Sequence, residues 1–159
     1  MVCGKNLINM LASGAGDWNA LRAQSSDGVM LNGASLPGAQ LAHADLHRAF
    51  LLNSDLEKAN LESARLDEAI LRKSNLRRTN LRSATFDRAD LFSADLSGAD
   101  LRDASLEWCF LRHTNLRGAD LSTARGLTQQ QILQAFGDGD TRLPENLARP
   151  ASWIAKDSH

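Results

Sequence analysis

Short polar side chains recur every five residues along the second half of the sequence, and groups of carboxylates can bind metal ions or act as acid–base pairs. The members of this series are Asp90, Asp95, Asp100, Asn115 and Asp120. Such side chains also hydrogen-bond the backbone of a nearby turn, which is a structural role. The repeat described below places successive members on different sides of the molecule, so they do not converge. We therefore expect no metal site in this series.

The histidine and cysteine residues are also candidates for chemistry, as general bases, nucleophiles or metal ligands. They are His43, His47, His113, His159, Cys3 and Cys109. None of them belongs to a CxxC pair, an HExxH motif or a recognisable Ser–His–Asp set, and the sequence has no glycine-rich phosphate-binding motif. The sequence therefore predicts no catalytic residues and no cofactor, with Cys109 as a buried thiol.

The composition limits the partners and the compartment. The 159 residues include 18 Lys and Arg against 19 Asp and Glu, a net charge of −1, which argues against direct binding of nucleic acid. The first residues contain no long apolar segment, and no apolar run approaches the roughly 18 residues of a membrane span. The two cysteines do not suggest a disulfide framework. These features predict a cytoplasmic protein without a membrane partner.

A five-residue repeat occupies most of the chain. Leucine stands at every fifth position from Leu31 to Leu121, with Phe86 as the one exception, which gives nineteen units over residues 29–123. The residue two positions before each centre is small in every unit except the first, where it is Val29. The residue directly before the centre is most often Asp or Asn. Neither a helix nor a strand has a period of five, so the repeat needs another explanation.

This A-(D/N)-L-X-X pattern resembles the pentapeptide-repeat family. The resemblance implies an all-β solenoid, a right-handed quadrilateral parallel β-helix of about four to five coils with short helical caps at both ends. Each unit would form one face, and four units would complete a coil. The central leucine and the small residue before it would point inward and fill the interior. A filled interior leaves no substrate pocket, so we expect the protein not to be an enzyme.

The open ends of a solenoid need capping segments. We expect residues 1–28 to form a helical N-terminal cap, residues 29–123 to form the β-helix, and residues 124–159 to form a C-terminal helix and an extended tail. In the N-terminal cap, Asp17 is the expected N-cap of a second short helix. Near the other end, Thr128 and Gln131 match a capping box for a helix over residues 128–136.

Large apolar side chains collect on one predicted side of the rod, which we call the apolar face. Its outward residues are Met30, Phe50, Leu52, Ile70, Phe92 and Phe110. In one interpretation, the N-terminal cap or the C-terminal helix folds back over this face. In the other, the face is a homodimer interface or the binding surface for a protein partner.

A group of five basic residues, which we call the basic band, surrounds one predicted coil. Its members are Arg72, Lys73, Arg77, Arg78 and Arg82. In one interpretation these charges pair with acidic residues of the neighbouring coils, as cross-strand pairs do. In the other, the band binds an acidic partner or a phosphate group. The band lacks interleaved aromatic residues, which argues against single-stranded nucleic acid.

The sequence therefore predicts a non-catalytic protein–protein interaction or scaffold module built on a rigid rod, whose partner is another protein or a second copy of the chain. The alternative is inhibition or protection of a type II topoisomerase by DNA mimicry, which the resemblance implies through the quinolone-resistance members of the family. Those members have strongly acidic surfaces, whereas residues 29–123 carry 13 acidic and 12 basic residues. Mimicry depends on charge complementarity, so the interaction module is favoured.

Overall fold

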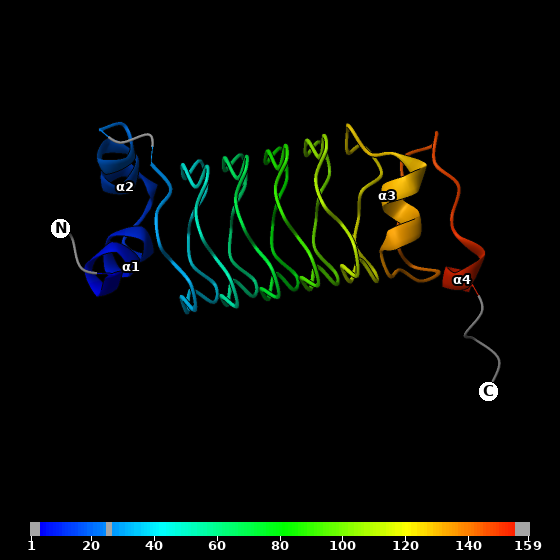
Figure 1. Cartoon of the computed structure of the whole chain (residues 1–159), viewed down its shortest axis with the longest axis horizontal. Helices are drawn as coiled ribbons and strands as arrows, with labels where there is room; N and C mark the ends of the chain where they lie inside the picture. The colour runs from blue at the N-terminus through cyan, green and yellow to red at the C-terminus, as the bar shows by residue number, and fades with distance from the viewer. Residues whose placement is uncertain (1–3, 25–26, 155–159) are drawn as a thin grey trace.

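The chain forms a rod of stacked square coils (Figure 1). The structure is a computed structural model, and it describes residues 4–24 and 27–154. Parallel single-residue bridges join positions twenty residues apart, from Met30 with Phe50 to Ser105 with Arg125. Four five-residue units therefore make one coil, and the predicted β-helical solenoid is confirmed. Cys3 and His159 lie outside the described residues.

Each coil is joined to the next through its backbone. The N–H of a central residue donates to the following coil, as from Leu31 to the carbonyl of Phe50 at 2.8 Å. The N–H of the residue before the centre donates to the preceding coil, as from Phe50 to the carbonyl of Val29 at 2.8 Å. A third bond closes each corner, as from Ala34 to Leu31 at 3.0 Å. Stacking thus supplies partners for backbone groups that a single coil would leave unpaired.

The corners require an unusual backbone conformation. The residue two positions after each centre has a positive φ throughout the series from Gly33 to Gly118. Glycine adopts this conformation without strain, but most of these positions hold other residues, with φ between 54 and 62°. The side chains at the corner point outward, so their types are set by solvent and by contacts on the surface rather than by core packing.

The core contains one large and one small side chain per face. The central residues from Leu41 to Leu121 are buried, and Phe86 fits the same series at 0% exposure. Several small positions hold buried hydroxyl groups instead of alanine. Ser54 donates to the carbonyl of Leu51 at 2.7 Å, and Thr79 donates to the carbonyl of Leu56 at 3.0 Å. These bonds keep the buried polar groups satisfied, as a dry core requires.

Two helices, α1 (Gly4–Ala12) and α2 (Ala15–Arg22), cover the N-terminal end of the rod (Figure 1). The expectation that Asp17 caps the second helix is wrong. Gly14 stands at the N-cap with φ 124°, and Asp17 lies in the first turn of α2. The tight connection between α1 and α2 requires this backbone angle, which favours glycine over a capping side chain.

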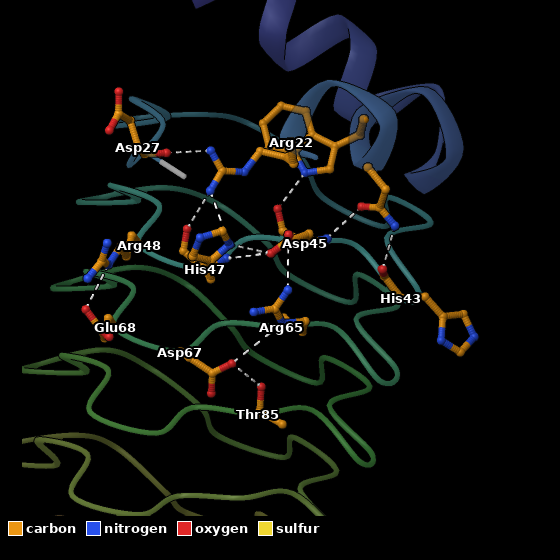
Figure 2. A network of polar contacts seen from close by, with 12 residues as sticks. Arg22, Asp27, His43, Asp45, His47, Arg48, Arg65, Asp67, Glu68 and Thr85 are labelled. Atoms are coloured by element: carbon orange, nitrogen blue, oxygen red, sulfur yellow. Dashed lines mark hydrogen bonds and ion pairs between the residues drawn. The ribbon is translucent and has the colours of Figure 1, made fainter. Parts of the chain in front are cut away.

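Side chains of α2 bond the exposed edge of the first coil. The Asn19 amide accepts from the N–H of Asp45 at 2.8 Å and donates to the carbonyl of His43 at 2.9 Å. Trp18 Nε1 donates to the carbonyl of Asp45 at 2.8 Å, and the buried Arg22 donates to the carbonyl of His47 at 2.9 Å (Figure 2). These side chains take the place of a preceding coil and protect the edge from pairing with another chain.

The C-terminal end is covered by α3 (Gln129–Gln134) and α4 (Ala151–Ile154) (Figure 1). The predicted capping box is confirmed, because Thr128 and Gln131 exchange both of its hydrogen bonds. The helix is shorter than predicted. Phe136 is extended and bridges to Asn115, because its N–H and carbonyl continue the hydrogen-bond ladder of the rod. The ladder therefore ends α3 before Gly137.

Beyond α3 the chain adds a last partial coil. Arg142 bridges to Asp120, and Thr141 donates to the carbonyl of Leu116 at 3.0 Å, as the buried threonines of the rod do. Asp138 accepts from the N–H of Gly118 at 3.0 Å. Burial alone would raise the pKa of Asp138, but the bonds from Gly118 and Thr141 outweigh it and hold the pKa below its ordinary value. This carboxylate therefore stays ionised where it caps the edge.

The burial of the leucine series predicts a contrast between two chemically identical changes. Leu76→Ala, at 0% exposure, should lower the free energy of unfolding by about 2–5 kcal/mol, because it leaves a cavity in the core. Leu133→Ala, at 59% exposure, should change it by less than about 0.5 kcal/mol. Urea denaturation followed by far-UV circular dichroism measures both. Equal losses in the two variants would contradict the assigned core.

The bonds of Asn19 predict a local effect on the first coil. Asn19→Ala should leave the N–H of Asp45 without a partner and destabilise the protein by about 1–3 kcal/mol. Amide hydrogen exchange should show loss of protection at Asp45. Asn9→Ala, at an exposed position of α1, is the matched control and should leave that amide protected. Unchanged protection of Asp45 in Asn19→Ala would refute the role given to Asn19.

Candidate functional site

The predicted apolar face is not one continuous surface. The bridges stack Met30, Phe50, Ile70, Asp90 and Phe110 in a single column, so a carboxylate interrupts the apolar residues. Phe50 and Ile70 are half-buried, whereas Met30 and Phe110 are exposed. The capping helices lie at the two ends of the rod (Figure 1). Neither cap covers the whole face, because Met30 and Phe110 stay exposed, although Gly28 lies against the Phe50 ring and α3 lies beside Phe110.

The remaining members of the apolar face have contacts of their own. Phe92 is half-buried, with the Arg72 guanidinium 6.0 Å above its ring and the His113 ring 5.6 Å away. The His113 ring also contacts Phe136 edge-on at 5.8 Å, so the three rings form a continuous row of contacts. Leu52 is exposed at a separate position of the rod. Structure thus divides the predicted face into smaller groups, of which Phe110 is the most exposed.

The basic band is largely paired with the following coil. Arg72 bonds Asp90 at 2.6 Å. The arginines at the next two corners form longer pairs, Arg77 with Asp95 at 3.8 Å and Arg82 with Asp103 at 3.9 Å. Within the residues that the structure describes, Lys73 and Arg78 have no such partner. The pairing interpretation therefore accounts for three of the five residues, and two cations remain.

A groove that the sequence did not indicate lies where the rod meets α3. We call it the aromatic groove. It encloses about 450 Å³. Its lining residues are Glu107, Trp108, Cys109, Phe110, Gly126, Thr128, Gln130, Gln131 and Gln134. Gln134 also lines a neighbouring cavity of about 240 Å³ beside the exposed Leu133, so the two hollows adjoin. This end of the rod therefore combines exposed apolar side chains with a concave surface.

Trp108 is the most exposed large apolar residue of the groove, at 75%. It occupies a corner with φ 57°, a conformation that disfavours a bulky side chain. The other described non-glycine residues at equivalent corners are polar or charged, as Arg88 and Ser93 are. Folding gains little from an indole in this place. The useful signal in the sequence was a tryptophan at a turn position of the repeat, and it was overlooked because those positions vary freely.

The floor of the groove is held rigidly. Gln131 donates to the carbonyl of Cys109 at 2.9 Å while its other amide atom completes the capping box with Thr128. Burial raises the pKa of the Cys109 thiol to about 12, so the thiol stays protonated at neutral pH. By contrast, Gln130 and Gln134 are exposed on α3. The groove therefore combines the aromatic side chains of Trp108 and Phe110 with the exposed amides of Gln130 and Gln134, next to a Gln131 that is held by hydrogen bonds.

His47 and Asp45 have structural roles near the N-terminal end of the rod. His47 bonds Asp45 at 2.7 Å beneath Arg22, and Asp45 also pairs with Arg65 at 3.3 Å (Figure 2). Among the described residues, no three His, Cys, Asp or Glu side chains gather as metal ligands would. The same part of the chain contains no helix with the length and apolar character of a membrane span.

Comparison with known proteins finds similarity to pentapeptide-repeat proteins. The sequence profile described as pentapeptide repeats matches residues 27–62, 59–98 and 99–125, with eight copies. HetL from the cyanobacterium Nostoc, a pentapeptide repeat protein involved in heterocyst differentiation regulation, aligns with a TM-score of 0.54 and 30% identity, over 69% of this chain and 56% of HetL. This chain thus spans little more than half of HetL. A comparison with curated protein sequences found no match.

Two further solved structures are similar. A pentapeptide repeat protein from the thylakoid lumen of Arabidopsis thaliana has 21% identity and a TM-score of 0.53, over 73% of this chain and 81% of that protein. Rfr23, a pentapeptide repeat protein from the cyanobacterium Cyanothece, has 29% identity and a TM-score of 0.48, over 84% and 95%. The family profile covers more than half of the sequence, in the register of the observed coils. The chain therefore belongs to the pentapeptide-repeat family and is a right-handed quadrilateral β-helix.

Proposed function

We propose that this protein is a non-catalytic interaction module that binds a protein partner through the aromatic groove. The observation that carries the proposal is the 75% exposure of Trp108 at a left-handed corner. A bulky side chain in that conformation adds strain, and its exposure means that it contributes little to the core. A contact with a partner would bury the indole and give it an energetic role.

The surroundings of Trp108 support this role. Phe110, at 62% exposure, lies on the same groove, and Leu133, at 59%, lies on the adjoining α3. Tryptophan and other aromatic residues are enriched among the few side chains that dominate binding energies at protein interfaces. The groove adds a concave, mostly fixed surface that could receive a protruding side chain of the partner. A second copy of this chain is the alternative occupant.

DNA mimicry of the topoisomerase type is the less favoured function. Many carboxylates of the rod are paired with arginines, as Asp90 and Asp120 are, which reduces the negative field that mimicry needs. The rod also carries nearly equal numbers of acidic and basic residues. Inhibition of DNA supercoiling by a type II topoisomerase, at stoichiometric protein, would instead favour mimicry.

The proposal predicts that Trp108→Ser strongly weakens partner binding without harming the fold. Serine already occupies equivalent corners at Ser63, Ser83 and Ser93, so the free energy of unfolding should stay within about 1 kcal/mol of the original. Proteins retained by the immobilised chain would be identified by mass spectrometry, and the affinity measured by calorimetry. The expected loss of affinity is roughly thirtyfold or more, as for an interface hot spot.

Leu52→Ser is the matched control, because Leu52 is an exposed apolar residue on the rod outside the groove. The control should keep the affinity of the original protein. Light scattering of the purified chain would show whether the occupant is a second copy, in which case the mass falls in Trp108→Ser alone. Equal binding by the original protein and Trp108→Ser, in the presence of a defined partner, would disprove the role of the groove.

A further inference from the structure

The charges of the rod are balanced in number but separated in space. Units ten residues apart occupy opposite corners, because twenty residues make a coil. One corner carries Asp67, Asp87 and Glu107 at successive levels of the stack. The opposite corner, half a coil away, carries Arg77 and Arg78 at the first of these levels, the uncharged Ser97 and Gly98 at the second and Arg117 at the third. A neutral rod therefore has an acidic edge and a basic side.

Four exposed cations define what we call the basic face. They are Lys73, Arg78, Arg112 and Arg117, at the two corners that border the face of Leu76, Leu96 and Leu116. Within residues 4–24 and 27–154, none of the four has a carboxylate within ion-pair distance. Arg117 bonds the neutral amide of Asn115 at 3.2 Å and lies over the ring of Phe136. The positive charges of these four side chains are thus not neutralised by ion pairs within the described residues.

The acidic residues near the basic face are already occupied. Asp90 is held by Arg72, and Asp95, in the middle of the face, is 3.8 Å from Arg77 and accepts from the Asn115 amide at 3.0 Å. Glu57 hydrogen-bonds the amide of Asn75 and pairs with Lys58, which lowers the pKa of this carboxyl. These contacts keep the local carboxylates engaged, so the four cations of the basic face are left for an external partner.

The shape of the basic face suits an elongated ligand. Lys73 and Arg78 belong to one coil, and Arg112 and Arg117 stand two coils further along, which is about 10 Å at the spacing of stacked strands. Three of the four corner residues of the coil between them, Ser93, Ser97 and Gly98, are small, and the fourth is the half-buried Phe92. An extended segment or a helix could lie across this low strip with cations on both sides.

We propose that the basic face binds an acidic segment of a partner protein, whose carboxylates contact Lys73, Arg78, Arg112 and Arg117. Complementary charge would guide the encounter and fix the orientation of the segment. A nucleic acid fits less well, because a fixed carboxylate, Asp95, lies in the middle of the face and the far corner is acidic. The basic face adjoins the aromatic groove, because Arg117 lines the smaller cavity beside it, but Lys73 and Arg78 line neither hollow. Variants of Lys73 and Arg78 and variants of Trp108 therefore test the two proposals independently.

The test uses fluorescein-labelled poly-L-glutamate and the full chain at low ionic strength, with binding followed by fluorescence anisotropy. The original protein should bind, and the affinity should fall as salt is raised, because exposed charges are screened. The double variant Lys73→Glu/Arg78→Glu should lose affinity at least about tenfold. Trp108→Ser should bind poly-L-glutamate as the original protein does.

The matched control is Arg88→Glu/Arg125→Glu. It changes the net charge by the same amount, and both residues are exposed, lie outside the basic face and have no ion-pair partner among the described residues. It should lose less than about threefold in affinity, since only the general field changes. Equal losses in the two double variants, or no binding by the original protein at low salt, would overturn the proposal. Tighter binding to duplex DNA than to poly-L-glutamate of equal charge would also overturn it.

Discussion

Hydrogen bonds between coils at an offset of twenty residues hold this molecule together. Each bridge position donates to the coil before it and each central residue to the coil after it, as Phe50 and Leu31 do. The ladder forms only when every face has the same length, so the five-residue period and the buried leucines depend on one another. It also requires positive φ at the corners, where residues such as Arg48 and Lys58 have a strained backbone. The hydrogen bonds and packing between the coils offset the energy of this strain.

The same ladder leaves backbone N–H and carbonyl groups unpaired at the two ends of the rod. Several side chains form hydrogen bonds with these groups in place of another coil. Asn19 offers one acceptor and one donor to the first coil. At the other end the carboxylate of Asp138 receives the N–H of Gly118, while the Gln129 amide holds the C-terminal tail through two bonds of 2.9 Å to the backbone of Ala148. Amides suit this task because they carry a donor and an acceptor in one plane. An edge so occupied is blunted against further strand addition.

Stacking also determines which outward side chains lie next to one another on the surface. Because the core is filled by residues that every unit shares, differences between units lie at the outward positions. Because positions twenty residues apart are stacked, charges that are mixed along the sequence come together in columns on the surface. Some of these charges neutralise one another, as Arg72 and Asp90 do, whereas the positive charges of Arg78 and Arg117 are not neutralised by an ion pair. The end of the rod adds a different kind of surface, since α3 can form a groove only where the repeat stops. Proposed binding sites of two chemistries thus occur on one rigid frame.

The sequence by itself determined the solenoid, its core and the start of α3, because the leucine period and the Thr128–Gln131 pair are local patterns. It did not determine where α3 ends, because the bridge of Phe136 to Asn115 is a contact between distant residues. The N-cap of α2 was mispredicted for a related reason, since a tight turn at Gly14 outweighed the capping preference of Asp17. Only the tertiary structure decided which outward residues lie together. Asp90 divides the apolar face, and α3 forms a groove with Trp108 and Phe110. The basic face combines cations from two coils that are separated by a third. These features depend on neighbours twenty or more residues away, which a five-residue pattern does not specify.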